Sequence, residues 1–266
     1  MTMLEEIFAN KHLEVEARKR QVPLAGLLAE AEKAPCAPDF IQAIRCVGYA
    51  PALIAEVKFA SPSKGCLVEE PDPVVLAQTY AENRAAALSV LTDEKYFQGH
   101  LDYLKQIHAV LPELPLLRKD FIYDPYQIYE TRAAGASAVL LITAHFDQAQ
   151  LTGLHRLVLS LGMTALVEVH NHRELETALR IEGLQLLGVN NRDLHTFNVD
   201  LQTCLELRQL VPQEICFVAE SGIHNAAEVH QLRKAGVDAM LVGEALVTAS
   251  DIGEKIRSLT TRELVV

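Results

Sequence analysis

The chain has 266 residues and a mass of 29.4 kDa, half of its residues are hydrophobic, and its formal net charge at pH 7 is −11. This length suits one large α/β domain or two small ones. The acidic balance argues against nucleic acid as a partner, because a phosphate backbone requires a basic protein surface.

Membrane and secretion signals are missing from the pattern of residues. No apolar run approaches the roughly 20 residues that a membrane span requires, and the first residues lack the basic and apolar regions of a signal peptide. The five cysteines are odd in number and include no Cys-x-x-Cys spacing. They indicate neither a disulfide framework nor a zinc site, so we expect a cytoplasmic protein with no membrane partner.

Two amphipathic stretches open the chain and predict helices over Leu4–Arg20 and Leu24–Lys33. We interpret residues 1–50 as an N-terminal helical extension packed on the domain that follows. Beyond residue 50, short runs rich in Val, Ile, Leu and Ala predict strands over 52–58, 87–92, 115–118, 137–142, 164–169, 185–189, 215–219 and 238–242.

Amphipathic segments separate these runs at intervals of roughly 20 to 35 residues, as in βα units. Helix starts are indicated by a cap residue before proline or by a capping box, at Asp72, Asp124, Asn171 and Asn225. Gly135 and Gly236 stand where helices are expected to end. Eight strands alternating with helices over this length predict a closed (β/α)8 TIM barrel, a single domain over residues 1–266.

The first predicted strand carries two opposite charges, Glu56 and Lys58, which face the same side because side chains alternate along a strand. A Ser-Pro-Ser-Lys-Gly loop, Ser61–Gly65, follows directly. Such charges are costly to bury unless they pair or act on a ligand. A buried ion pair that fixes the strand register is the structural alternative.

A barrel of this type places its active site at the carboxyl ends of the strands. Six of the eight predicted strands end in polar or charged residues, which a purely structural barrel would not need. After the first strand, these candidates are Arg118, Lys119 and Phe121 on the third, Glu168 on the fifth, Asn190 and Arg192 on the sixth, Glu220 and Ser221 on the seventh, and Gly243 and Glu244 on the eighth.

The charges in this set favour acid–base chemistry. Lys58 and Lys119 are candidate acids or anion-binding groups, and three carboxylates are candidate bases or hydrogen-bond acceptors: Glu56, Glu168 and Glu220. Ammonium and carboxylate groups that share a dry rim can have their pKa values moved toward neutrality. The set suits proton transfers around a carbonyl or enamine of a phosphorylated substrate.

A phosphate site is expected at the last two turns. Ser221-Gly222 and Gly243-Glu244 follow the seventh and eighth strands, where small residues let backbone amides approach a phosphate. No catalytic triad, nucleotide fingerprint or metal-ligand cluster is visible, so neither a metal nor a cofactor is predicted. His170 and His172 have a His-x-His spacing without matching ligands on other strands, and we interpret them as solvated loop residues.

The strand ends resemble those of the indole-3-glycerol-phosphate synthase family of tryptophan biosynthesis. The matching stretches occur in family order and are Ile54–Gly65, Leu117–Ile122, Leu166–His170, Gly188–Leu194, Ala219–Ile223 and Leu241–Ala245. The resemblance implies a carboxy-lyase that closes the pyrrole ring of 1-(2-carboxyphenylamino)-1-deoxyribulose 5-phosphate and releases carbon dioxide and water, without a cofactor.

The resemblance also implies roles for the charged residues. By motif position, Lys119 is the general acid that protonates the substrate carbonyl, and Glu168 is the second acid–base group, which acts in dehydration. Lys58 pairs with the anthranilate carboxylate or shares in acid catalysis. Glu56 orients Lys58 or accepts a proton.

The remaining matches imply substrate contacts. Asn190 and Arg192 hold the substrate and the intermediate, and Phe121 forms an apolar wall for the aromatic ring. The implied phosphate contacts are Ser61, Ser221, Gly222 and Gly243. Many relatives carry serine where this chain has Glu244, so the backbone and not the side chain is expected to contact phosphate there.

Two alternative functions stay open at this point. One is another phosphate-binding barrel of the pathway, similar to phosphoribosylanthranilate isomerase. The other is a non-catalytic regulatory barrel, which would be expected to lose at least one of Lys58, Lys119 and Glu168. The expected partner is a phosphorylated small molecule, and functional association with other tryptophan-pathway enzymes is a further expectation.

Overall fold

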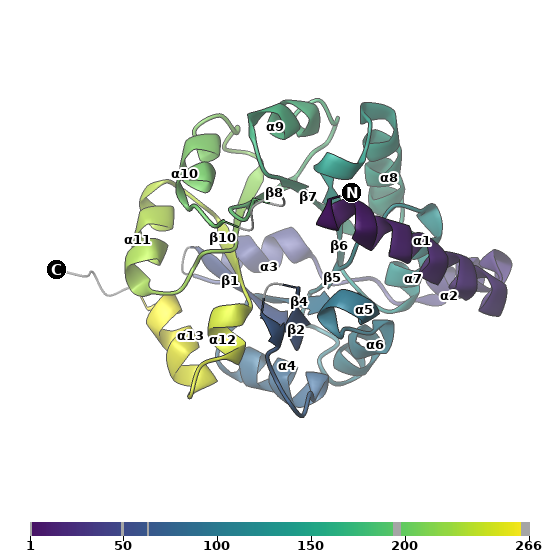
Figure 1. Ribbon diagram of the computed structural model, residues 1–266, viewed down its shortest axis with the longest axis horizontal. Coiled ribbons are helices and arrows are strands. Elements are labelled where there is room, and N and C mark those ends of the chain that lie inside the picture. The colour runs from purple at the N-terminus through teal and green to yellow at the C-terminus, as the bar shows by residue number, and fades with distance from the viewer. Residues whose placement is uncertain (1, 49–50, 63, 194–197, 262–266) are drawn as a thin grey trace.

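A computed structural model describes residues 2–48, 51–62, 64–193 and 198–261. Its eight parallel strands close into a barrel in which each strand pairs with two neighbours (Figure 1). Around the barrel they are β1 (Ala52–Val57), β10 (Ala239–Val242), β9 (Cys216–Glu220), β8 (Leu186–Asn190), β7 (Thr164–Val169), β6 (Ala138–Ile142), β5 (Leu116–Lys119) and β4 (Ala87–Leu91). Each overlaps one predicted run, so the predicted (β/α)8 TIM barrel is confirmed.

Helices surround the strands as a ring (Figure 1). After the first strand they are α4 (Pro73–Glu82), α5 (Glu94–Phe97), α6 (Leu101–Val110), α7 (Pro125–Ala133), α8 (Gln148–Ser160), α9 (His172–Ala178), α10 (Gln202–Arg208), α11 (Ala226–Lys234), α12 (Glu244–Val247) and α13 (Ile252–Thr260), with a 3-10 turn η1 (Thr143–His145). Within the described ranges, no helix combines the length and apolarity needed to cross a bilayer.

The predicted helix ends are confirmed with one exception. Asp72, Asp124 and Asn225 cap α4, α7 and α11, and Gly135 and Gly236 have the positive φ angles expected after a helix. Asn171 caps α9, since its side chain accepts a hydrogen bond from the backbone of Glu174. The capping box predicted there is incomplete, because the Glu174 carboxylate bonds to His170 instead.

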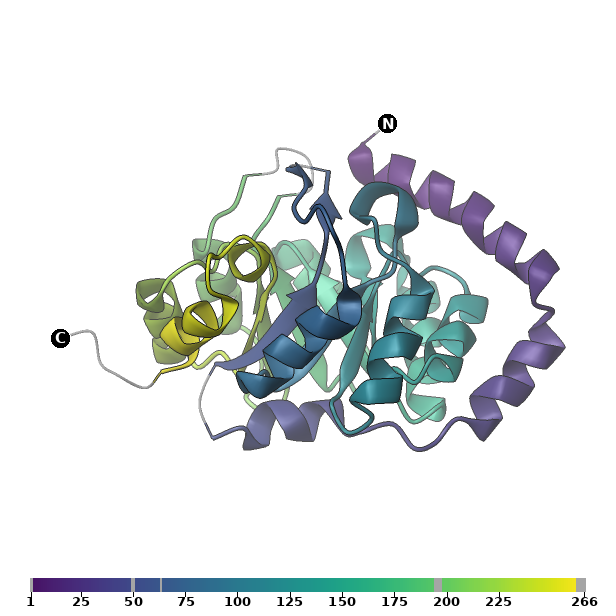
Figure 2. The ribbon, with the colours of Figure 1, turned by 90° about the horizontal axis from the view of Figure 1, so that it is seen from below.

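Three helices precede the barrel: α1 (Met3–Gln21), α2 (Leu24–Lys33) and α3 (Phe40–Cys46). The first two were predicted, whereas α3 was not, because seven residues are too few to show a helical period. Figure 2 shows α1 at one end of the barrel and α3 at the other. Phe40 and Ile44 of α3 are buried in the cluster that fills the barrel interior, so α3 closes the end opposite α1.

A short antiparallel pair, β2 (Ala60–Ser61) and β3 (Gly65–Cys66), rises beyond the end of β1 on the same side as α1 (Figure 2). It was not predicted, because two-residue strands carry no periodic signal. Ser63 of the Ser61–Gly65 loop lies outside the described residues, as does Leu194 at the end of the sixth-strand motif.

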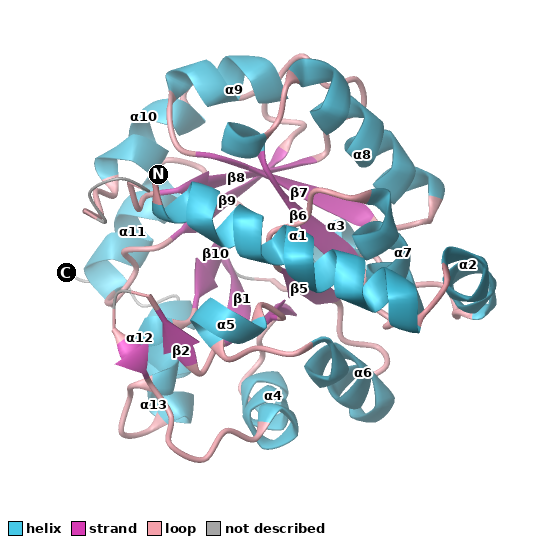
Figure 3. Cartoon of the chain, turned by 45° about the vertical axis from the view of Figure 1, so that its right-hand side comes forward, coloured by secondary structure: helices cyan, strands magenta, loops and turns pink. Residues whose placement is uncertain are grey.

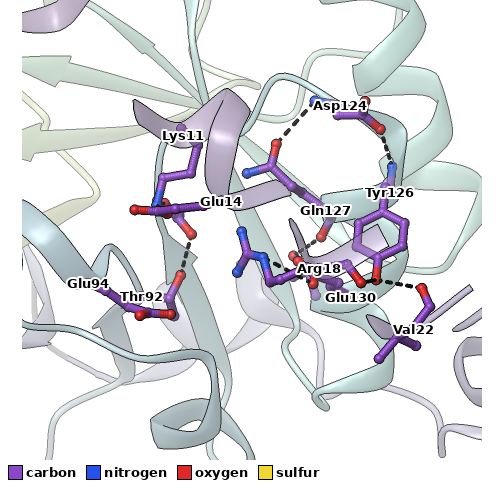
Figure 4. Close-up of polar contacts among 12 residues, drawn as sticks. Lys11, Glu14, Arg18, Val22, Thr92, Glu94, Asp124, Tyr126, Gln127 and Glu130 are labelled. Carbon is purple, nitrogen blue, oxygen red and sulfur yellow. Dashed lines mark hydrogen bonds and ion pairs between the residues drawn. The ribbon is translucent and has the colours of Figure 1, made fainter. Parts of the chain in front are cut away.

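Buried ion pairs fasten α1 to the barrel. Lys11 has no exposed surface, and its Nζ lies 2.6 Å from Glu14 Oε2, 2.8 Å from Asp93 Oδ2 and 2.9 Å from Asp120 Oδ1. We call these four residues the outer cluster. Figure 3 shows α1 crossing the ends of the strands, and Figure 4 shows Lys11 and Glu14 above Thr92.

The outer cluster continues into a second set of buried charges. Thr92 Oγ1 donates to Asp120 Oδ2 at 2.6 Å, and Arg118 Nη2 lies 2.9 Å from the same oxygen. Arg118 Nη1 lies 3.2 Å from Glu130 Oε2, near Arg18 of α1 (Figure 4). The extension is therefore bound to the loops after β4 and β5 by charges that water does not reach.

Candidate active site

A cavity opens at the carboxyl ends of the strands, beneath the start of α1. All the residues that the sequence predicted for the site except Arg118 line it: Glu56, Lys58, Ser61, Lys119, Phe121, Glu168, Asn190, Arg192, Glu220, Ser221, Gly222, Gly243 and Glu244. Because the strands are parallel, side chains far apart in the sequence meet at this rim. The roles inferred for these residues from the family resemblance remain proposals.

Lys119 forms the centre of the charged part of the cavity. Its Nζ donates to Glu168 Oε2 at 2.8 Å and to Glu220 Oε2 at 2.5 Å. We call these three residues the inner cluster. With Glu56, they come from β1, β5, β7 and β9, which are alternate strands of the barrel and so can share one interior layer.

The pKa values of the two carboxyl groups in the inner cluster are displaced in opposite directions. Burial alone would lower the pKa of Lys119, but Glu168, Glu220 and Glu56 outweigh burial and raise it. Burial would raise the pKa of Glu168, but Lys119 and His170 hold it below its usual range. For Glu220, burial and the Glu168 carboxylate outweigh Lys119, so its pKa is raised. The pKa values of two carboxyl groups that share one lysine are thus separated, as in sites that need both an acid and a base.

Glu56 and Lys58 face the same cavity, as the strand alternation predicted. Glu56 Oε2 lies 2.8 Å from Lys58 Nζ, and the Lys58 side chain is the more exposed of the two. The ion-pair alternative is therefore present in the structure, yet both groups also line the cavity and remain available to a ligand.

Two glycines make room for carboxylates. A Cβ at Gly188 would overlap Glu220 Oε1, and a Cβ at Gly243 would overlap Glu56 Oε2. The role of Gly243 is therefore wider than the predicted phosphate contact, because any side chain there would displace a charged group of the site.

A polar network connects the ends of β8 and β9. Ser221 Oγ donates to Asn190 Oδ1 at 2.9 Å, and the backbone N–H of Arg192 donates to the same oxygen at 3.1 Å. Ser221 and Gly222 both have positive φ angles, +65° and +77°, so the chain turns sharply beside the cavity. This turn brings Asn190, Arg192, Ser221 and Gly222 to one side of the site.

The opposite wall is apolar. Phe121 packs edge-on against Phe8 of α1 at 5.5 Å between ring centroids, and Phe97 lies 6.0 Å from it. Met3, Leu4 and Ile7 of α1 also line the cavity. The sequence did not indicate these α1 residues, since its pattern predicts an amphipathic helix but not where the apolar face packs.

At the mouth, Lys64 Nζ lies 3.6 Å from Glu244 Oε1. Lys64 thus partly offsets the negative charge of Glu244 beside the proposed phosphate site. Phe59, which follows Lys58, is buried and packs edge-on against Tyr103, so it does not line the cavity.

Two interpretations from the sequence are wrong. Only Lys119 of the Arg118-Lys119 pair reaches the cavity; Arg118 points to the helices and is fully buried among Asp120, Glu130 and Thr92, because neighbouring residues on a strand face opposite sides. His170 is not a solvated loop residue. Its side chain is only 8% exposed and lies between Glu168 and Glu174, whereas His172 is 64% exposed as expected.

Asn191 is a further residue that the sequence analysis did not single out. It is buried, its Nδ2 donates to the backbone oxygen of Ser221, and its Oδ1 accepts from the backbone of Cys204. It therefore supports the Ser221 turn from behind. Its place in the Asn-Asn pair of the sixth-strand motif was the available signal.

Comparison with known proteins identifies the family. The model of the indole-3-glycerol phosphate synthase family matches residues 4–259. The chain is 53% identical to the indole-3-glycerol phosphate synthase of Roseiflexus castenholzii, over 98% of this chain and 99% of that protein, and 48% identical to the enzyme of the same name from Dehalococcoides mccartyi, over 97% and 99%. The chain belongs to the indole-3-glycerol phosphate synthase family.

Membership confirms the resemblance inferred from the strand-end motifs. The family is one of decarboxylating lyases of tryptophan biosynthesis. Solved structures support the fold independently. The 3-hexulose-6-phosphate synthase of Salmonella typhimurium aligns with a TM-score of 0.64 over 78% of this chain and 96% of that one, and a thiamine phosphate pyrophosphorylase of Pyrococcus furiosus aligns with 0.57 over 78% and 93%. Their identities of 15% and 17% show a shared barrel and nothing finer.

Proposed function

We propose that this chain converts 1-(2-carboxyphenylamino)-1-deoxyribulose 5-phosphate to indole-3-glycerol phosphate, carbon dioxide and water. The observation that carries the proposal is the inner cluster, which lies in a cavity with an aromatic wall. Its lysine bridges two carboxyl groups, one with a lowered pKa and one with a raised pKa. That arrangement provides an acid and a base for a carbonyl substrate.

The proposed binding mode uses the two sides of the cavity. The aromatic ring of the substrate lies against Phe121, and its carboxylate faces Lys58. The phosphate lies on the opposite side, where Ser61, Ser221, Gly222, Gly243 and the Glu244 backbone line the cavity. Asn190 and Arg192 hold the hydroxyl groups between these ends.

The first proposed step is ring closure. The aromatic carbon that bears the carboxylate bonds to the ribulose carbonyl carbon, while Lys119 gives a proton to the carbonyl oxygen, which becomes a hydroxyl group. The carbon–carboxylate bond then breaks, carbon dioxide leaves, and its electron pair restores the aromatic ring. The raised pKa of Lys119 keeps the ammonium charged at neutral pH, so the proton is present when the substrate binds.

The second proposed step is loss of water. The C–O bond breaks as the new hydroxyl group takes a proton from an ammonium group of the site and leaves as water. Glu168, the acid–base group of this step, accepts a proton from the neighbouring ring carbon, and the electron pair of that C–H bond forms the pyrrole double bond. Glu220, which shares Lys119 with Glu168, holds the ammonium between the two steps and accepts a hydrogen bond from it. Glu56 orients Lys58 or accepts a proton.

We also propose that the chain associates with other enzymes of the pathway and acts in the cytoplasm. The product of one step and the substrate of the next are phosphorylated small molecules, which exchange readily between neighbouring enzymes. Cys36, Cys46 and Cys66 carry exposed free thiols, which suits a reducing compartment.

The test is product formation from the purified chain. The chain contains no tryptophan, so indole fluorescence from product will rise over a background of tyrosine alone. We expect indole-3-glycerol phosphate and carbon dioxide in equal amounts without added metal or nucleotide. A folded sample that forms no indole product, with or without a divalent metal, would contradict the proposal, and consumption of phosphoribosylanthranilate would instead indicate the isomerase.

A further inference from the structure

His170 lies between two carboxylates at the end of β7. Its Nε2 is 3.3 Å from Glu168 Oε1, and its Nδ1 is 3.0 Å from Glu174 Oε2. Glu174 also accepts from the backbone N–H of His170 at 2.8 Å and from Asn171 Nδ2 at 2.7 Å. The first turn of α9 thus fixes the Glu174 carboxylate, which in turn fixes the plane of the imidazole ring.

Glu168 consequently has a cation on each oxygen. Lys119 bonds to Oε2 from the cavity side, and His170 approaches Oε1 from the other side. Burial would lower the pKa of His170, but the Glu168 and Glu174 carboxylates on either side raise it to about 10, so the ring is an imidazolium ion at neutral pH. Within the described part of the chain, its buried Nε2 makes no hydrogen bond, so its 3.3 Å contact with Glu168 Oε1 is an ion pair.

A second cavity borders His170 on the side away from Lys119. His170, Asn171 and Glu174 line it together with α1, and the other titratable or charged groups that face it are Glu5, His12, His145 and Asp193. Burial lowers the pKa of His145 to about 4, so that ring is neutral and stacks on Phe8. His170 therefore stands between two cavities, with the reacting groups on one side only.

We infer that His170 is a positioning residue, which keeps the Glu168 carboxylate ionised and directed toward Lys119 during the reaction. The inference rests on the proposed function, because it assigns a purpose to Glu168 as an acid–base group. It adds to the proposed machinery one residue that lies outside the active-site cavity. His170 touches no substrate and acts only through Glu168.

The removal of the imidazolium ion has a defined consequence. An opposite charge within hydrogen-bonding distance favours the ionised carboxyl group, so its loss raises the pKa of Glu168. The acid limb of the kcat–pH profile then moves to higher pH. We expect a shift of about one pH unit in His170→Ala, with kcat about tenfold lower on the acid side, and KM within about twofold of wild type.

His172→Ala is the matched control, since His172 lies two residues away, at the start of α9, and is 64% exposed beside Glu176. We expect its profile to coincide with that of wild type. Glu174→Gln is the second variant: it keeps His170 but removes the carboxylate that supports the imidazolium charge, so its acid limb is expected to move in the same direction by less. Glu174→Gln also keeps the test decisive if His170→Ala does not fold.

A measurement without substrate completes the test. The imidazole nitrogen signals of His170 in NMR titrations are expected to show a charged ring at neutral pH in wild type and an earlier loss of the proton in Glu174→Gln. If wild type forms product but His170→Ala and His172→Ala share its pH profile, the inference is overturned and the proposed function stands. If wild type forms no product, the proposed function fails.

Discussion

The inner and outer clusters are built alike, each with one lysine among carboxylates, but they occupy different surroundings. Both lysines have a raised pKa, because neighbouring carboxylates outweigh burial. In each cluster one carboxyl group has a lowered pKa, Asp120 or Glu168, and one has a raised pKa, Asp93 or Glu220. Electrostatics alone would mark both as active sites.

Access of the lysine to the cavity distinguishes them, although Asp120 of the outer cluster also lines the cavity. Lys119 lines the cavity and retains 14% exposure, whereas Lys11 has none and lines no part of it. Structural ion pairs also perturb pKa values, so a perturbed group becomes a catalytic candidate only where a ligand can reach it. Asp120 joins the two regions, since it follows Lys119 in sequence and binds Lys11.

The largest expected effect is on the inner cluster. Replacement of Lys119 by alanine removes the proposed general acid, and such a loss lowers kcat by about 10²–10⁴-fold. The barrel core does not depend on this ammonium, so circular dichroism should show an intact fold. Near-wild-type turnover in a folded Lys119→Ala sample would remove Lys119 from the mechanism.

For the outer cluster we expect a loss of stability instead of a loss of turnover. Lys11→Met leaves Asp93 and Asp120 buried without their shared cation, a loss that costs about 3–5 kcal/mol of unfolding free energy. Urea unfolding measures it. The control is Lys19→Met on the same helix, where the lysine is one-third exposed beside Glu16 and Asp124 and the expected cost is about 1 kcal/mol or less. Equal costs for the two variants would contradict a structural role specific to Lys11.

A third prediction concerns phosphate. Gly222→Glu brings a carboxylate to the proposed phosphate side, and we expect KM to rise about 10–100-fold, the equivalent of one lost charge-assisted hydrogen bond. Gly162→Glu is the control, because Gly162 has a similar φ of +72° and open space around it. An unchanged KM in Gly222→Glu would mean that phosphate binds elsewhere.

A fourth prediction concerns the pH dependence of stability that His170 contributes. Its pKa is raised to about 10 by Glu168 and Glu174 despite burial, so its contribution is complete below its unfolded pKa and is lost as pH rises through about 10. The free energy of unfolding of wild type should therefore fall over this range more than that of His170→Ala. Parallel curves for the two proteins would show that the imidazolium adds no stability.

The sequence predicted the barrel well because its strands are apolar runs separated by clear helix caps, and both signals are local. It also predicted which residues line the cavity, since parallel strands bring their carboxyl ends to one rim. Residues such as Glu56, Lys119 and Glu168 needed only their position at a strand end.

Features that depend on contacts between distant segments were not predictable in this way. Lys11 meets Asp93 and Asp120 across more than 80 residues of sequence, and nothing in the amphipathic pattern of α1 marks it as buried. His170 was assigned to solvent because the packing of α1 and α9 around it depends on the tertiary structure. The helix α3, which closes the far end of the barrel, was too short to show a period.

The most direct test of the account is a comparison of single-turnover rates of indole formation in wild type, Lys119→Ala and Lys11→Met, at a temperature where all three are folded. The account predicts that Lys119→Ala slows the reaction by about 100-fold or more, while Lys11→Met stays within about threefold of wild type. If Lys119→Ala were to react within about threefold of wild type, or Lys11→Met were to be slowed as much as Lys119→Ala, the division between a catalytic inner cluster and a structural outer cluster would be wrong.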